Sequence, residues 1–156
     1  MKQALFISSL AMIQALEFSL ESTIQHCPTD SQLEYFTAYL DGELVIKVNR
    51  QLFFQQPNML VAELGIKLKD WLAKRQEVLG PLPFEYFTID HDESEGPIIS
   101  LQPIDEEQYC ISSIWQEIEG PVLISQQLFA DAAQLFIRQL ETELLSRGSV
   151  PLANLL

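Results

Sequence analysis

Three short apolar segments between Phe84 and Glu119 constrain the fold more than any other part of the chain. Their residue patterns predict three consecutive strands, Phe84–Asp90, Pro97–Ile104 and Glu107–Ile118. Two short acidic turns, residues 90–96 and 105–107, join these strands. Strands joined by such short turns are antiparallel neighbours. This stretch therefore predicts the centre of an antiparallel sheet.

Two further extended segments precede this unit. Gln32–Leu40 and Glu43–Phe54 flank Asp41-Gly42, a dipeptide that favours a type I′ turn because both central residues of that turn need positive φ. The sequence therefore predicts a β-hairpin with its turn at Asp41-Gly42. Upstream, the two-residue period of Ala15–Glu21 indicates a half-buried strand, while a helix that continues through Ile24 stays open as the alternative.

Two segments show the helical spacing of apolar residues. The first starts after Pro57, with Asn58 as its expected N-cap and Gly80 just beyond its end. Its apolar stripe is Leu60, Leu64, Leu68, Trp71 and Leu72. The second helix has Ser125 as its N-cap and ends at Gly148. Its apolar stripe is Phe129, Ala132, Ala133, Phe136, Leu140 and Leu144.

The order of elements is therefore β-ββ-α-βββ-α, which belongs to the α+β class. The economical arrangement is a single antiparallel sheet of about five to six strands, with two main helices packed on one face. The chain of 156 residues is expected to form a single domain, residues 1–156. Residues 1–13 are expected to form an arm or a short helix, and residues 149–156 a loosely packed tail.

Acidic residues are concentrated around the predicted three-stranded unit. The chain carries a net charge of −13, and residues 76–137 contain twelve Asp or Glu but neither Lys nor Arg. This charge disfavours nucleic acids and anionic membranes as partners, because both are bound by clustered Lys and Arg. It favours a basic protein partner, which long-range attraction would steer toward the acids. Alternatively, the acids only keep the protein soluble and keep strand edges from associating.

The sequence matches no known catalytic or metal-binding motif. Asp90 and Asp92 occupy the first and third positions of an EF-hand pattern, but Glu95 stands where that pattern needs glycine and Leu101 where it needs glutamate. The two cysteines fit neither a disulfide framework nor a metal-ligand spacing. We therefore expect a protein that is not an enzyme and that uses no cofactor or metal.

Three short motifs resemble a group of small, acidic bacterial proteins. They are Phe84-Glu85-Tyr86-Phe87, the seven residues from Cys110 to Gln116, and the end of the first helix, Asp70-Trp71-Leu72. The resemblance covers roughly residues 32–147 and includes no catalytic residues. Proteins of this group often serve as immunity partners of secreted bacterial toxins. The resemblance therefore implies an immunity protein that neutralises a basic toxin.

The expected function is non-catalytic binding of a basic protein, and the alternative is a stand-alone or homodimeric domain with no toxin partner. The candidate partner-binding residues are Asp90, Asp92, Glu93, Glu95, Asp105, Glu106, Glu107 and, as apolar anchors if exposed, Tyr109 and Trp115. The first residues include a single Lys, and serines interrupt the apolar run that follows. This pattern does not match a signal peptide, so a cytoplasmic protein is expected.

Overall fold

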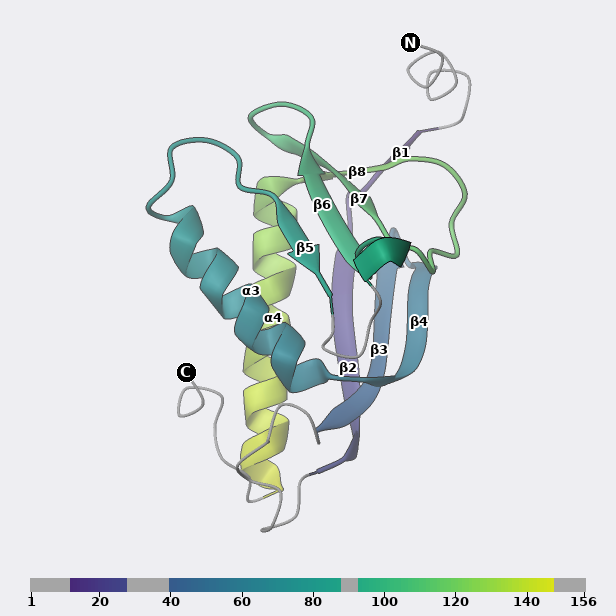
Figure 1. The fold of residues 1–156 in the computed structure, drawn as a ribbon, viewed down its shortest axis with the longest axis vertical. Helices are drawn as coiled ribbons and strands as arrows, with labels where there is room; N and C mark the ends of the chain where they lie inside the picture. Colours follow the sequence, from purple (N-terminus) through teal and green to yellow (C-terminus); the bar gives the residue numbers. More distant parts are fainter. Residues whose placement is uncertain (1–11, 28–39, 88–92, 148–156) are drawn as a thin grey trace.

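The computed structural model describes residues 12–27, 40–87 and 93–147, which form two sheets and two helices (Figure 1). The five-stranded sheet contains, in spatial order, β1 (Ile13–Gln14), β8 (Val122–Ser125), β7 (Gln108–Ser112), β6 (Ile99–Pro103) and β5 (Phe84–Tyr86). The three-stranded sheet contains β2 (Phe18–His26), β3 (Asp41–Val48) and β4 (Gln51–Met59). A short 3-10 helix, η2 (Glu93–Glu95), precedes β6.

The α+β class is confirmed, but the prediction of a single antiparallel sheet is wrong. The small sheet is antiparallel throughout, whereas the large sheet is mixed because β1 runs parallel to β8. The helices α3 (Val61–Arg75) and α4 (Gln126–Ser146) pack against each other. α3 also contacts β3 and β5, and α4 also contacts β2 and β8. The two helices thus form one layer that covers both sheets (Figure 1).

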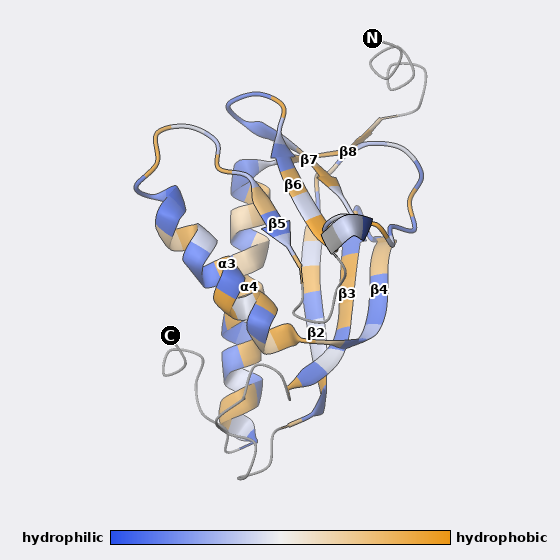
Figure 2. Ribbon diagram, viewed as in Figure 1, coloured by the Kyte–Doolittle hydropathy of each residue, from blue (hydrophilic) through white to orange (hydrophobic). Residues whose placement is uncertain are grey.

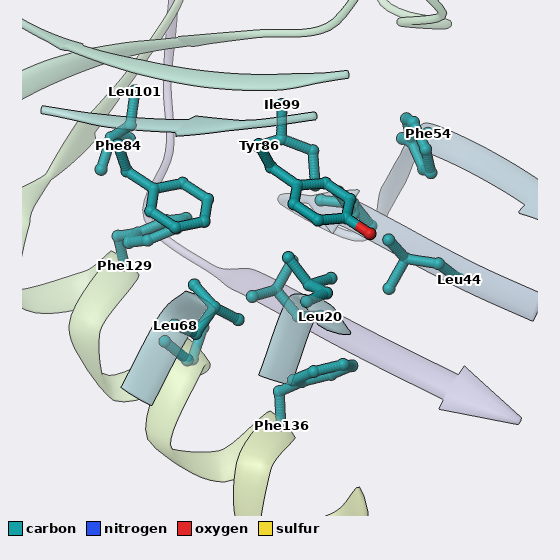
Figure 3. Packing of buried hydrophobic residues seen from close by; sticks show 14 of the residues in the cluster. Leu20, Leu44, Phe54, Leu68, Phe84, Tyr86, Ile99, Leu101, Phe129 and Phe136 are labelled. Atoms are coloured by element: carbon teal, nitrogen blue, oxygen red, sulfur yellow. The ribbon is translucent and has the colours of Figure 1, made fainter. Parts of the chain in front are cut away.

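Apolar side chains from both sheets and both helices form a single core. Figure 3 shows Tyr86 of the large sheet close to Leu20 and Leu44 of the small sheet, with Phe136 of α4 on the helical side. All six residues of the predicted stripe of α4 are buried. In α3 the predicted stripe is also buried, except that Leu72 is half-buried. Buried and less buried residues alternate along β3, as expected for a strand with one buried face, and Figure 2 shows both apolar and polar residues in this strand.

The chain around residues 13–26 contributes to both sheets. Its first part adds β1 to the large sheet, where the Ala15 N–H donates to the Leu123 carbonyl at 2.7 Å. The predicted strand in this region is confirmed, but it forms β2 and continues beyond Ile24. The break between the two strands is held by Asn49, whose Oδ1 accepts from the N–H groups of Leu16 at 2.7 Å and Glu17 at 3.0 Å. One segment can therefore change sheets without leaving these two N–H groups unpaired.

The predicted hairpin turn at Asp41-Gly42 is wrong. These two residues begin β3, and residues 32–39 of the predicted partner strand lie outside the described residues. The β3–β4 turn lies at Asn49-Arg50, where φ is 50° and 69°. Two successive positive φ angles are what a type I′ turn requires. Asn is among the residues that tolerate this conformation, whereas Arg is not, so the turn was hard to recognise.

Gly42 has a different role from the one predicted, because β2 passes very close to it. A Cβ atom at this position would lie 2.4 Å from the carbonyl oxygen of Thr23 and 3.0 Å from its carbonyl carbon. Both atoms belong to the backbone of β2, which is paired with β3 on either side of this point. The close approach of the two strands therefore requires glycine here.

The boundaries of the other elements differ from the predicted ones mainly at their ends. Asn58 does not cap α3: it belongs to β4 with φ 59°, and Leu60 is the N-cap residue, without a side-chain hydrogen bond. The helix ends at Arg75, before Gly80. For α4 the predicted cap is confirmed, since Ser125 Oγ accepts from the Leu128 N–H at 3.1 Å. The expectations for residues 1–11 and 149–156 lie outside the described residues.

Neither of the two described helices is long and apolar enough to cross a membrane. Cys27 and Cys110 are both free thiols. Burial raises the pKa of the Cys110 thiol, which keeps it protonated and unreactive at neutral pH.

Candidate functional site

The predicted acidic contacts that the structure describes lie in two groups. The turn that follows β5 and the turn that follows β6 lie at opposite ends of β6, because the three strands are antiparallel. The five residues of β6 separate these ends by about 14 Å. Glu95, in η2, is exposed at one end, and Asp105, Glu106 and Glu107 are exposed at the other. Asp90, Asp92 and the side chain of Glu93 lie outside the described residues.

Asp105 holds the β6–β7 turn together. Its Oδ1 accepts from the backbone N–H groups of Glu107 and Gln108, both at 2.8 Å. These hydrogen bonds lower the pKa of the Asp105 carboxyl below its ordinary value. The Glu107 carbonyl in turn accepts from the Gln126 N–H at 2.9 Å, which ties the turn to the start of α4. The Asp105 carboxylate therefore stabilises the turn through its Oδ1.

Replacing Asp105 with asparagine should reduce stability at neutral pH and have little effect in acid. A folded-state pKa below the unfolded value stabilises the fold above the unfolded pKa of about 3.9, and this contribution is lost as pH falls through the folded pKa. Urea unfolding of wild type and D105N, measured from pH 6 downward, should show a difference that shrinks with acidification. Parallel pH profiles would contradict this role for Asp105.

Tyr109 is predicted to be an apolar anchor only if it is exposed, and the structure shows that it is not. It is fully buried, at 0% exposure, and lies in β7 facing the helices. Its hydroxyl accepts from the Leu82 N–H at 2.9 Å and donates to the Leu82 carbonyl at 3.0 Å. Burial raises the pKa of this hydroxyl. Tyr109 therefore anchors the segment before β5 to the core and is not available as a contact for a partner.

Trp115 is exposed, as an anchor must be, because the predicted third strand ends early. β7 stops at Ser112, and Trp115 lies in the loop 113–121 that leads to β8. The Trp115 side chain is 39% exposed, and its ring lies 6.3 Å from that of Phe54 in β4, centroid to centroid. The neighbouring Ile114 is 37% exposed. An indole and an aliphatic side chain thus stand together at the surface, beside an edge strand of the small sheet.

The side chain of Gln116 holds this loop in one conformation. Its Oε1 accepts from the Ser113 N–H at 3.1 Å, and its Nε2 donates to the carbonyls of Ile118 at 2.8 Å and Gly120 at 3.3 Å. The Trp115 N–H donates to Ser113 Oγ at 3.0 Å. The Glu117 N–H donates to the Phe53 carbonyl at 2.7 Å, which fastens the loop to β4. These bonds fix the backbone on both sides of Trp115.

Three acids flank this pair of apolar side chains. Glu117 and Glu119 are exposed on the loop, on either side of Ile118, which packs against the core. Glu95 is exposed in η2, and the adjoining Gly96 lies against the loop, where a Cβ atom would be 3.5 Å from Ile114 Cγ2. We call this set the docking surface. It consists of Glu95, Ile114, Trp115, Glu117 and Glu119.

The contacts predicted from sequence include Trp115 and Glu95 but not the other members of the docking surface. Ile114 and Glu117 lie within the predicted third strand, Glu107–Ile118, and Glu117 and Glu119 are among the twelve acids of residues 76–137. Nothing in the residue spacing indicated that Gln116 would hold the loop. Among the described residues, no three His, Cys, Asp or Glu side chains lie together as a metal site.

The family comparison covers most of the chain. A model of a domain of unknown function, DUF7878, matches residues 16–146. The protein belongs to the DUF7878 family. The DUF7878 match runs from just before β2 to the end of α4 and includes the whole docking surface, whereas β1 precedes it. No curated protein and no solved structure matches this DUF7878 chain.

Proposed function

We propose that this DUF7878 protein is a non-catalytic binding protein that holds a basic protein partner on its docking surface. The observation that carries the proposal is Trp115, a half-exposed indole on a loop that is already fixed by internal hydrogen bonds. Tryptophan is enriched among the residues that dominate binding energy at protein interfaces. A loop ordered before binding loses less conformational entropy when the partner docks.

The acids around Trp115 support a basic partner rather than a neutral one. Glu117 and Glu119 are exposed on the loop that carries Ile114 and Trp115, and Glu95 is exposed in η2, next to Gly96, which lies against that loop. Apolar anchors surrounded by polar residues are the usual composition of a protein interface. Acids at the border raise the rate of encounter with a positively charged surface more than they raise the final affinity.

The partner class that we propose is a basic bacterial toxin, with this protein as its cytoplasmic immunity partner. The resemblance of the Cys110–Gln116 segment and of Asp70-Trp71-Leu72 in α3 supports this role. A nuclease toxin fits the charge argument, since an enzyme that binds phosphates carries clustered Lys and Arg. Binding would neutralise such a toxin by covering part of that basic surface.

Charge reversal at the docking surface should slow association with the partner. We expect Glu117→Lys combined with Glu119→Lys to lower the association rate constant about tenfold at low salt and to flatten its salt dependence. Glu106→Lys combined with Glu107→Lys makes the same change of charge at the opposite end of β6 and is the matched control. Measured at physiological salt, the control should change the rate constant less than about twofold, because its charges then lie beyond a Debye length of about 8 Å.

The experiment begins with a pull-down from native host cells, washed at low and then at high salt. The basic protein released by high salt is purified, its association is followed by stopped flow, and its nuclease activity is assayed with and without this chain. Equal slowing by both double variants would remove the docking surface from the proposal. Recovery of this protein alone would favour the stand-alone or homodimeric alternative, and a captured partner that keeps its activity would remove the immunity role.

A further inference from the structure

The basic residues of this acidic protein are gathered on its helical layer. Eight Lys and Arg lie within the described residues, and six of them belong to α3, to α4 or to the residue that caps α4. These six are Lys67, Lys69, Lys74, Arg75, Arg138 and Arg147. The helical layer is thus the one part of the described structure where an anion would meet several positive charges, on a different side of the molecule from the docking surface (Figure 1).

Arg138 differs from most of its basic neighbours in lacking an acidic partner. Lys69 pairs with Glu141 at 3.2 Å, Lys74 with Asp70 at 3.0 Å and Arg147 with Glu143 at 3.3 Å. Within the described part of the chain, Arg138 forms no ion pair, and its side chain is exposed on α4. Its guanidinium therefore keeps its donors for a ligand.

A hollow of about 440 Å³ lies between α3 and α4 beside this guanidinium. Its described lining is Lys69 and Leu72 from α3, and Gln134, Ile137 and Arg138 from α4. Leu72 and Ile137 also pack against the core, so they give the hollow a firm apolar floor. A volume of this size is within the range of sites for small molecules, about 300–1,000 Å³.

We infer that this hollow binds a small amphipathic carboxylate, with the carboxylate on Arg138 and the apolar body on Leu72 and Ile137. A guanidinium matches the two oxygens of a carboxylate through parallel hydrogen bonds. Lys69 adds a second positive charge, although Glu141 already shares it. The apolar surface of Leu72 and Ile137 favours a ligand with an aliphatic or aromatic body. A small inorganic anion is disfavoured, because it would leave this surface exposed to water.

The net charge of −13 opposes the binding of any anion at long range. At physiological salt this opposition is screened over about 8 Å, so the charges nearest to the hollow decide the outcome. On α3 and α4 themselves, Lys and Arg are as numerous as Asp and Glu. With Arg138 included, the charges of the two helices therefore balance, so the field near the hollow is close to neutral.

Octanoate serves as the probe, titrated into the full chain while amide resonances are recorded by NMR. We expect saturable shifts confined to residues that line the hollow, with a dissociation constant of about 1 mM, which is ordinary for a ligand of this size. 1-Octanol, which lacks the charge, should bind about tenfold more weakly. Acetate, which lacks the apolar body, should cause no saturable shift.

Variants at exposed positions distinguish specific binding in the hollow from non-specific binding elsewhere on the surface. Arg138→Gln should weaken octanoate binding about tenfold, the loss expected when a charged hydrogen-bonding partner is removed. Arg138→Lys should recover part of this loss. Arg50→Gln, an exposed arginine in the β3–β4 turn that pairs with Glu17, is the matched control and should bind as wild type does.

Several results would overturn the inference. They are shifts spread over the whole surface, no saturable shift up to about 10 mM, equal binding by R138Q and R50Q, or equal binding of octanoate and 1-octanol. The native amide spectra of the variants verify that each is folded. The inference does not depend on the proposed function, because the titration contains no protein partner.

Discussion

Replacing Trp115 with alanine should weaken the complex with the protein partner by about 2–4 kcal/mol, which is roughly a 30- to 1,000-fold rise in Kd. The indole presents a large apolar surface at little entropic cost, because its loop is held by Gln116 before the partner arrives. Most of the loss should appear as faster dissociation. The measurement is the dissociation rate constant of the purified complex, obtained by surface binding or stopped flow.

A matched control comes from the other end of the large sheet. Ile104, 56% exposed just after β6, can be replaced by alanine to remove an exposed apolar side chain outside the docking surface. This variant should bind the partner as wild type does. Urea unfolding of both variants verifies that neither has lost its fold, since Trp115 also packs near Phe54. Equal dissociation rates for W115A and wild type would move the interface away from this loop.

Replacing Gly42 with alanine should lower the free energy of unfolding by about 3 kcal/mol or more, a large fraction of the stability of an ordinary domain. The new Cβ would stand 2.4 Å from the Thr23 carbonyl oxygen, a backbone atom that cannot turn away as a side chain does. Relief would require β2 and β3 to separate where they are paired on both sides. Urea or thermal unfolding, followed by circular dichroism, measures the loss.

Gly80→Ala is the control for this substitution. No atom lies within 4 Å of a Cβ atom at Gly80, but φ is +108° there. Its cost should be about 1 kcal/mol, from backbone conformation alone. A G42A variant no less stable than G80A would show that the strands separate easily, and it would contradict the steric argument. If G42A does not fold, the smaller effect of G80A still separates the steric cause from the loss of a glycine.

The elements that could be predicted from sequence are those defined by local periodicity. The apolar stripe of α4 recurs at helical spacing, so its six buried residues and its Ser125 cap followed from the sequence alone. The period of two in Leu44, Ile46 and Val48 likewise matches the buried face of β3. Both patterns arise within one element, where each residue's face depends only on its neighbours in the chain.

The division into two sheets could not be predicted, because it depends on contacts between distant residues. Asn49 lies 33 residues from Leu16, yet its side chain closes the backbone where the chain leaves one sheet for the other. The turn at Asn49-Arg50 could not be recognised from the sequence for a related reason. Asp41-Gly42 is the stronger turn signal by composition, but the close approach of Thr23 places it inside a strand.

Only part of the candidate site could be predicted, and the geometry of the strands explains why. Closeness in sequence predicts that the acids share one surface, but consecutive antiparallel strands carry their turns to opposite ends. Tyr109 and Trp115 would share one face in a continuous strand, since six residues separate them and side chains alternate with a period of two. The strand ends at Ser112 instead, so Tyr109 stays in the core and Trp115 emerges.

The pairing of β1 with β8 has a consequence for how the protein is made. The strand at residues 13–14 finds its partner only at residues 122–125, and Ile24 meets the Glu143 carboxylate 119 residues further along the chain. The large sheet cannot be completed until residues 122–125 have left the ribosome. Such distant pairing slows folding, to milliseconds or seconds for domains of this kind. Until α4 is made, the apolar side chains of β2 lack their helical cover, and such exposed apolar surface is what chaperones bind during synthesis.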